Sequence, residues 1–332
     1  MRERDIRPAR LLEQYLALTA TDALEWFDVQ AGSWEECVGC GGHESSPAFE
    51  KAGFSYASCD RCSTLFLNPR PPSRQFDAFY RDSQSSRYWA EVFFPAVAEA
   101  RREKVFRPRV ERLGEILRPA ETGIGCVVDA GAGYGIFLEE WGRRWPGARL
   151  VAVEPSPLLA DVCRSKGFEV IETVVENLVG QNETADLVTC FEVLEHVYHP
   201  LEFLKALVGL LRPGARLVVS TLTIDGFDLR LLQDQSAQIT PPHHINFLSK
   251  DGLRRLFSRA GLSDIEISTP GRLDVDIVRN AVEKMPEGSF AQRVIEALAP
   301  DDESAEDLQE HLVRHGLSSH AWVVARRPMD TR

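Results

Sequence analysis

From Cys126 to the C-terminus, short apolar runs alternate with longer segments in which apolar residues recur at a helical spacing. The apolar runs are nearly continuous, as expected for strands buried on both faces of a parallel sheet. Helices between successive parallel strands cover those two faces, so the pattern predicts an α/β fold with a doubly wound sheet. The clearest predicted strands are CVVDA from Cys126, RLVAVE from Arg149, FEVIE from Phe168, DLVTCFEV from Asp186 and ARLVVST from Ala215.

The remainder of the chain shows other patterns. Apolar positions near the N-terminus follow a helical period, two cysteine pairs come next, and the prolines of LNPRPP end that stretch in extended geometry. Two further strands are expected at about Ser263–Ser268 and in HAWVVARRP. We therefore predict a helical segment at 1–36, a cysteine module at 37–72, a helical connector at 73–121, the sheet domain at 122–270 plus 317–332, and a helical insertion at 271–316.

Composition narrows the class of protein. With 44% hydrophobic and 27% charged residues among 332, the chain can bury a core, and no apolar run reaches the length of a membrane span. The N-terminus has no signal-peptide pattern, so we expect a cytoplasmic protein that is a monomer or a homodimer and does not bind membranes. The net charge of −12 disfavours nucleic acid as a partner, because binding to its phosphates requires basic patches.

One basic run stands out against this acidic background. Its members alternate with apolar residues on an expected helix, which favours a solvated helix face; a phosphate-bearing substrate is the alternative. The run consists of Arg101, Arg102, Lys104, Arg107 and Arg109.

Two C-x2-C pairs, Cys37 with Cys40 and Cys59 with Cys62, are separated by eighteen residues. Four thiolates at this spacing are the ligand set of a structural zinc site, and a zinc-ribbon-like module is expected. Disulfides are the competing interpretation, and the absence of an export signal favours zinc. The module is predicted to stabilise a segment too short to hold its own core, with partner or substrate binding as the other possible role.

A glycine-rich turn follows the strand that begins at Cys126, in the order Asp129, Ala130, Gly131, Ala132, Gly133, Tyr134, Gly135. The spacing G-x-G-x-G, with an acidic residue ahead, resembles motif I of class I S-adenosylmethionine-dependent methyltransferases. Glu154 at the end of the next strand, DLVTCFEVLEHV and LLRPGARLVVST resemble further motifs of that family in the same order. The resemblance implies a Rossmann-like sheet of seven strands whose last strand is antiparallel.

The same resemblance implies which residues bind S-adenosyl-L-methionine. Asp129 and the glycine turn are expected to bind the methionine part of the cofactor. Glu154 is expected to bind the ribose, because its carboxylate can accept hydrogen bonds from both ribose hydroxyls. The adenine edge falls to Val174, Val175 and Glu176; many relatives carry Asp where this chain has Val174, so backbone groups or Glu176 are expected to act there. The full expected set is Asp129, Gly131, Ala132, Gly133, Tyr134, Gly135, Glu154, Pro155, Val174, Val175, Glu176, Phe191 and Glu192.

Transfer from a sulfonium is an in-line displacement, so the protein must position the acceptor and needs a base only for a protonated acceptor. The expected bases are His244 first, then its neighbour His243, both in the loop after the fifth strand, and His196 in EVLEH. Hydrogen-bonded loop histidines without a catalytic role are the alternative. Glu192, Glu195 and His196 are also a plausible ligand set for a divalent cation.

The layout of cysteine module and sheet domain resembles that of bacterial sugar C-methyltransferases and related enzymes of glycan or secondary metabolism. In those enzymes a Glu-His pair after the fifth strand serves as base; here His243 stands in place of the Glu, and no further C-terminal domain follows. We therefore expect a small-molecule acceptor, such as a sugar, glycan or secondary-metabolite hydroxyl or carbon. The competing hypotheses are an RNA methyltransferase that uses the zinc module and a cofactor-binding scaffold without turnover.

Overall fold

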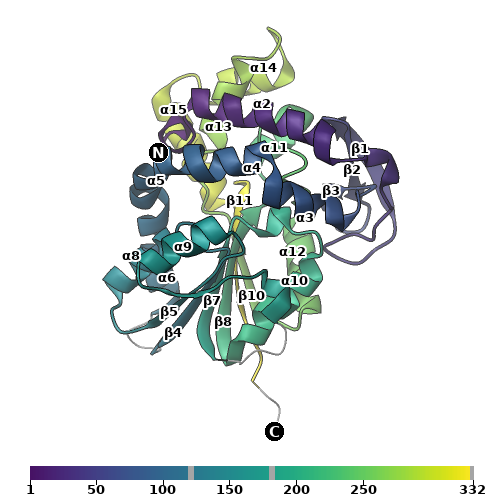
Figure 1. Cartoon of the computed structure of the whole chain (residues 1–332). Coiled ribbons are helices and arrows are strands. Elements are labelled where there is room, and N and C mark those ends of the chain that lie inside the picture. The colour runs from purple at the N-terminus through teal and green to yellow at the C-terminus, as the bar shows by residue number, and fades with distance from the viewer. Residues whose placement is uncertain (119–122, 179–183, 330–332) are drawn as a thin grey trace.

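A computed structural model describes residues 1–118, 123–178 and 184–329. A seven-stranded sheet dominates it, in the order β10-β11-β8-β7-β4-β5-β6 (Figure 1). Neighbours from β8 to β6 pair in parallel, whereas β11 runs antiparallel to both β8 and β10. The doubly wound sheet with an antiparallel last strand is thus confirmed. The strands are β4 (Cys126–Ala130), β5 (Arg149–Val153), β6 (Glu169–Ile171), β7 (Ala185–Phe191), β8 (Leu211–Leu222), β10 (Ser263–Ser268) and β11 (His320–Arg326).

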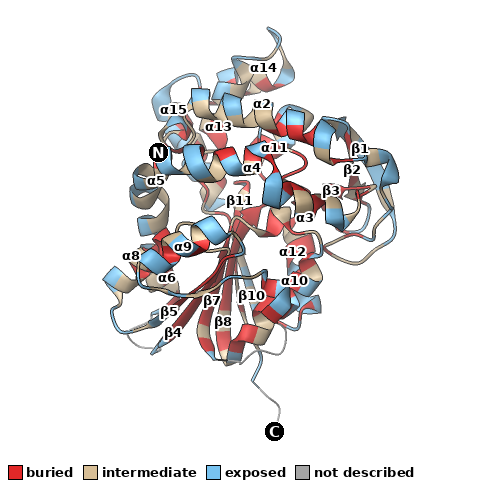
Figure 2. Cartoon of the chain, viewed as in Figure 1, coloured by how far each residue is buried: buried red, intermediate tan, exposed pale blue. Residues whose placement is uncertain are grey.

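Helices cover both faces of this sheet, and its central strands are buried in Figure 2. On one face, the core of α10 and α12 meets residues such as Val128 and Val219. On the other, α6 and α8 pack around Trp141 and Val127. Burial on both sides explains why these strands are apolar throughout. The covering helices are α6 (Arg107–Leu117), α8 (Ile136–Arg144), α9 (Pro157–Ser165), α10 (Pro200–Leu210) and α12 (Lys250–Arg259).

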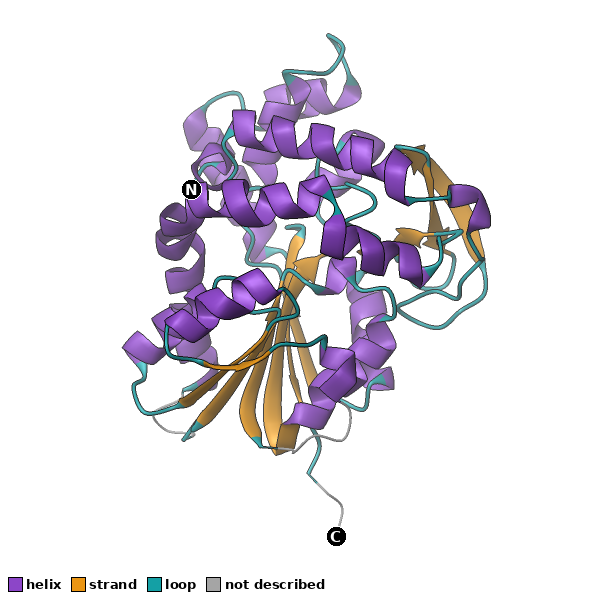
Figure 3. Cartoon of the chain, in the orientation of Figure 1, coloured by secondary structure: helices purple, strands orange, loops and turns teal. Residues whose placement is uncertain are grey.

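The N-terminal helices form a second layer over the carboxyl ends of the parallel strands, as Figure 3 shows. Two single π-helical turns, Trp89–Phe93 and Arg102–Phe106, interrupt its later helices. The expected boundary between residues 121 and 122 lies outside the described residues. The helices of this layer are α1 (Glu3–Ile6), α2 (Ala9–Trp26), α3 (Ser73–Asp82), α4 (Gln84–Tyr88) and α5 (Phe94–Arg101).

A small antiparallel sheet lies beside that helical layer, in the order β1-β2-β3-β9. Its first three strands, β1 (Ser45–Lys51), β2 (Phe54–Cys59) and β3 (Leu65–Leu67), come from the cysteine module. The fourth, β9 (Asn246–Phe247), comes from the loop after β8, so one sheet joins two distant parts of the sequence. The aromatic core beneath it includes Phe54, Tyr56 and Phe79.

Residues 271–316 contain α13 (Asp274–Val282), α14 (Phe290–Leu298) and α15 (Asp302–Arg314), which share a core with α11 (Phe227–Leu232). The chain's first residues contact this group, because Arg2 forms ion pairs with Asp276 and Asp302. No helix in the described part of the chain is both long and apolar enough to cross a membrane.

Candidate functional site

The glycine-rich turn lies at the carboxyl end of β4 and leads directly into α8. Gly131, Gly133 and Gly135 have φ values of 72°, 54° and 65°, a region that side chains with a Cβ avoid. A Cβ on Gly131 would lie 2.6 Å from Val193 Cγ2, whereas one on Gly133 would meet no atom within 4 Å. The backbone at Gly133 is therefore open on the side that a Cβ would occupy.

Glu154 follows β5 and turns back toward this loop. Its carboxylate accepts hydrogen bonds from the backbone N–H groups of Gly133, at 2.8 Å, and Ser156, at 2.9 Å. Burial raises the pKa of Glu154, while these two bonds favour its ionised form. The carboxylate thus lies beside the open turn, as a ribose-binding residue must, whereas its neighbour Pro155 is exposed.

Asp129 lies inside β4 and is buried. Its carboxylate accepts a 2.6 Å hydrogen bond from the Thr189 hydroxyl on β7. Burial raises its pKa to about 7, although this bond and the charge of Arg109 act against the rise. Asp129 therefore fastens β4 to β7 directly below the turn.

The three residues expected at the adenine edge precede or begin a single 3-10 turn, Val175–Leu178, after β6. The Val175 side chain is buried in the core, whereas Val174 is 44% exposed and Glu176 is exposed. Side-chain contact with a ligand is consequently open to Val174 and Glu176, and Val175 can contribute only through its backbone.

Phe191 is the last residue of β7, and Glu192 follows it directly. The Phe191 ring packs edge-on against Phe137 and faces the guanidinium of Arg109, whose carbon lies 4.3 Å from the ring centroid. Glu192 has a φ of 57°, which is unusual for a residue with a Cβ. Such backbone strain persists only where surrounding contacts hold it.

Three side chains hold the Glu192 carboxylate. It accepts from Ser220 Oγ at 2.5 Å, from His320 Nε2 at 2.7 Å and from Arg109 Nη2 at 3.1 Å. Burial acts to raise its pKa, but His320 and Arg109 keep that pKa well below its usual range. His320 could not be predicted from the sequence, because a histidine at the start of a strand carries no functional signal.

The expected solvated face of the basic run is wrong for Arg109, which is only 4% exposed. Arg107 is exposed, Arg102 is half-buried, and both bond the buried Glu140. Apolar residues between the basic ones gave the run its helical appearance. Some of the basic side chains point inward with these apolar residues. The spacing alone does not tell which basic residues are buried and which are exposed.

Glu195, His196 and His244 meet at the sheet edge from two separate loops. One ligand atom from each lies within 4.8 Å of the others, and the two imidazole centroids are 4.7 Å apart. Among the described residues, this set and the four cysteines of the module are the two groups that could hold a metal ion. The predicted trio of Glu192, Glu195 and His196 is therefore not brought together: Glu192 turns to Arg109 and His320, and His244 takes its place.

The hydrogen bonds around this trio define which atoms face it. His244 Nδ1 lies 2.5 Å from the Gln238 carbonyl oxygen and must donate to it, so Nε2 carries the lone pair. Glu195 is buried and accepts from the Thr221 hydroxyl at 2.9 Å. Burial and the neighbouring Glu192 raise the pKa of Glu195 to about 8, and burial lowers that of His244 to about 4 and that of His196 to about 3.

His243 is placed differently from its neighbour. It is buried among the rings of Tyr15, Phe79 and Tyr80, and its Nε2 lies 3.2 Å from Ser85 Oγ. Burial lowers its pKa well below the usual range. His243 therefore anchors the loop to the helical layer.

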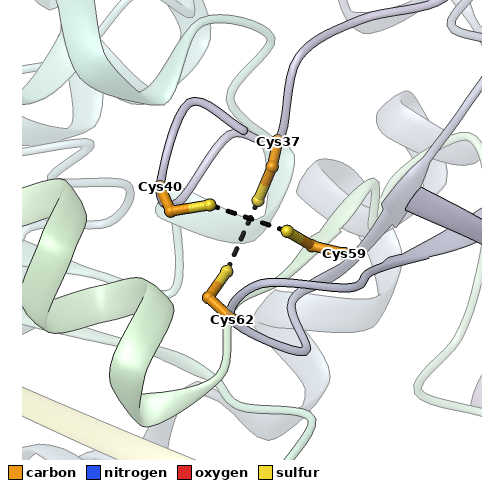
Figure 4. Close-up of side chains that lie close together, drawn as sticks. All are labelled: Cys37, Cys40, Cys59 and Cys62. Carbon is orange, nitrogen blue, oxygen red and sulfur yellow. Dashed lines mark hydrogen bonds between the residues drawn. The ribbon is translucent and has the colours of Figure 1, made fainter. Parts of the chain in front are cut away.

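The four module cysteines point toward one common point (Figure 4). All four sulfurs lie within 4.8 Å of one another, with Cys37–Cys62 at 3.5 Å and Cys40–Cys59 at 3.6 Å. A tetrahedral zinc site with bonds of about 2.3 Å requires sulfurs about 3.8 Å apart, whereas a disulfide requires about 2.05 Å. The cluster therefore matches the geometry of a zinc site, and all four are free thiols.

Comparison with known proteins adds to this geometry. A family model described as a methyltransferase domain matches residues 97–267. A ubiquinone biosynthesis O-methyltransferase of Xanthomonas axonopodis is 31% identical over 173 residues, which is 48% of this chain and 70% of the relative. The mitochondrial enzyme of that name from Schizosaccharomyces pombe is 35% identical over 124 residues, 35% of this chain and 44% of that one.

Among solved structures, a SAM-dependent methyltransferase from Archaeoglobus fulgidus aligns with a TM-score of 0.47 at 16% identity. The alignment covers 70% of this chain and 99% of that chain.

Proposed function

Because the chain belongs to the S-adenosylmethionine-dependent methyltransferases, we propose that it methylates a hydroxyl group of a small molecule, with His244 as general base. The observation that carries the proposal is that the His244 ring, whose Nδ1 is held by Gln238, lies beside Glu195 at the same sheet edge as the glycine turn. The relatives' name, O-methyltransferase, supports an oxygen acceptor. A sugar or glycan hydroxyl belongs to this class of acceptor.

The residues of this chain suit the methyl donor. The open backbone at Gly133 leaves room for the methionine part, and the Glu154 carboxylate beside it suits the ribose hydroxyls. Tyr134, Ala132 and Gly135 complete the turn, while Val174 and Glu176 are placed for the adenine edge. The bound donor supplies an activated methyl group on a sulfonium, and the protein positions the acceptor in line with it.

His244 is the proposed proton acceptor because its ring is fixed and neutral. Gln238 holds Nδ1–H, and the low pKa of about 4 leaves the ring unprotonated near neutral pH. When Nε2 takes the hydroxyl proton, the new positive charge lies beside the Glu195 carboxyl group. Glu195 then takes the part that the Glu of the Glu-His pair plays in the sugar enzymes.

His244→Ala should lower kcat by about 10²- to 10⁴-fold, the usual contribution of a general base. Affinity for S-adenosylhomocysteine, measured by calorimetry, should stay unchanged because the glycine turn and Glu154 are intact. His315→Ala, a histidine near the end of the helical insertion, is the matched control and should keep full activity. Equal kcat for His244→Ala and the wild type would exclude His244 as the base.

The pH profile gives a second measure of the same assignment. Because the pKa of Glu195 is raised to about 8, this group is protonated at neutral pH and ionises above about 8. Since His244 is already neutral there, kcat/KM should rise as the pH passes through about 8. Glu195→Gln should remove that limb of the profile; a limb that persists in this variant assigns the ionisation to another group.

A divalent cation on Glu195, His196 and His244 is the second candidate role of this trio. Two imidazoles and a carboxylate suit Mn²⁺, Co²⁺, Fe²⁺ or Zn²⁺, and a ring whose Nδ1 bonds a backbone carbonyl is the usual form of a metal-bound histidine. With His244 acting as base, we expect added Mn²⁺ or Co²⁺ to leave turnover unchanged. Stimulation that Glu195→Gln abolishes would instead assign the trio to a cation.

We further propose that Cys37, Cys40, Cys59 and Cys62 hold one structural Zn²⁺. The distances between their sulfur atoms suit a tetrahedral site with four protein ligands. Such a site has no open coordination position, so the ion would have a structural role.

A further inference from the structure

Arg101, the last residue of α5, is half-buried, and its guanidinium group has no acidic partner among the described residues. Its Nε is buried and makes no hydrogen bond, and no carboxylate of the described residues forms an ion pair with it. The aromatic rings of Phe94 and Trp89 face the group instead, with its central carbon 5.3 Å and 6.0 Å from their centroids. Flat aromatic faces hold a guanidinium in one orientation and leave its donors free along the edge.

Arg70 and Arg109 also have a buried Nε without a hydrogen bond, but their terminal nitrogens have partners in the protein. Arg70 donates to the Tyr198 carbonyl oxygen and to Asn246 Oδ1, and Arg109 pairs with Glu192. Arg101 differs from both, because its charge has no matching group. A partly buried cation without a counter-charge loses hydration and gains no ion pair in return, and the charge of a ligand would offset that cost.

The surroundings of Arg101 are positive on balance. Burial is the main cause that lowers its pKa to about 10, and Arg7 and Arg109 lower it further. Glu192 is the acidic group that acts on it, but Arg109 and His320 already hold that carboxylate. At neutral pH Arg101 is therefore protonated, and the region around it favours an anion.

One ring contact and one shared charge relate Arg101 to the two parts of the site. The Phe94 ring stacks on Tyr134 of the glycine turn, 4.6 Å between centroids with an interplanar angle of 4°. Because Phe94 uses one face for Tyr134, it separates Arg101 from the turn expected to hold the donor. Arg7, whose charge acts on Arg101, acts also on His244 and on Tyr15.

We propose that Arg101 binds a negatively charged group, a carboxylate or a phosphate, of the methyl acceptor. The inference rests on the proposed function, because the hydroxyl of the same acceptor faces His244. A planar guanidinium binds either anion through two parallel hydrogen bonds. The acceptor class is thus a hydroxy acid or a phosphorylated alcohol, and an aromatic acid would also fit the rings of Trp89 and Phe94.

The test compares acceptor analogues that differ only in charge. Calorimetry on the full chain loaded with S-adenosylhomocysteine measures 3,4-dihydroxybenzoate against catechol, and glucose 6-phosphate against glucose. In at least one pair the charged member should bind about tenfold or more tightly, as expected for a hydrogen-bonded ion. Arg101→Met should remove the preference, Arg101→Lys should keep part of it, and the matched surface variant Arg107→Met should keep all of it.

Equal affinity within both pairs, including no measurable binding of any member, would overturn the proposal, as would a preference that survives in Arg101→Met. A second measurement compares S-adenosylhomocysteine with 5′-methylthioadenosine, which lacks the amino-acid carboxylate. Both affinities should be the same in the wild type and in Arg101→Met. If only the affinity for S-adenosylhomocysteine falls, Arg101 serves the donor's carboxylate and the proposal is wrong. A wild type that binds neither nucleoside contradicts the proposed function itself.

Discussion

Gly131→Val abolishes binding of S-adenosylhomocysteine, with a loss of affinity of about 100-fold or more. Gly131 has a φ of 72°, and any Cβ there would lie 2.6 Å from Val193 Cγ2. Strain of that backbone and overpacking each cost about 1–3 kcal/mol, and relief requires the turn or Val193 to move. Calorimetric titration of the purified variant measures the loss.

The matched control is Gly147→Val. Gly147 has a φ of 103° and no atom within 4 Å of its added Cβ, and it lies in the turn before β5, away from the site. This variant carries backbone strain of the same kind but should bind the nucleoside normally. If Gly131→Val is folded by circular dichroism and still binds with wild-type affinity, the turn between β4 and α8 is not the donor site.

The parts of the fold that follow from near neighbours in sequence could be predicted. Each parallel strand is an apolar run of a few residues, and the turn after β4 is a local pattern of glycines whose positive φ values the structure confirms. Glu154 ends the next strand, and parallel strands align their carboxyl ends at one edge of the sheet. Its hydrogen bond to Gly133 is thus a consequence of two local features.

The parts of the site that depend on residues distant in sequence could not be predicted. His244 was predicted as base from its loop, but the approach of Glu195 depends on the packing of two loops against the end of β8. The basic run gave no sign that Arg101 and Arg109 turn inward in different ways, one without an acidic partner and one paired with Glu192. The spacing along a helix predicts which residues share one face. Whether the basic residues of that face are buried depends on the layer that packs against it.

The pairing of β3 with β9 could not be predicted from the sequence either, and it changes the role expected of the cysteine module. β9 begins two residues after His244, and its pairing with β3 ties the proposed base to the module. Tyr56 in β2 also donates a 2.6 Å hydrogen bond to the His244 carbonyl oxygen, and the Leu67 N–H donates to Ile245. Ser249 reaches back to the carbonyl of Cys62 itself. The cluster therefore supports the backbone from which His244 projects.

Cys37→Ser should release zinc and lower both thermal stability and turnover, with a smaller effect on donor binding. Structural zinc contributes several kcal/mol to folding, and a loss of about 5 kcal/mol corresponds to roughly 10 °C in Tm for a chain of this size. Turnover falls because the strand pairing beside His244 weakens, whereas Gly133 and Glu154 lie on the other sheet. Metal analysis, a thermal melt and calorimetry with S-adenosylhomocysteine measure the three effects.

Cys126→Ser is the matched control, because this buried thiol lies in β4 outside the cluster. It should keep one zinc per chain and nearly normal turnover. A wild-type protein that contains no zinc would contradict the assignment of the cluster. If Cys37→Ser loses its zinc but retains full kcat, the module stabilises only itself, and the contacts from Tyr56 and β3 do not position His244. A fall in kcat without a matching fall in nucleoside affinity is the result that links the metal to the acceptor side of the site.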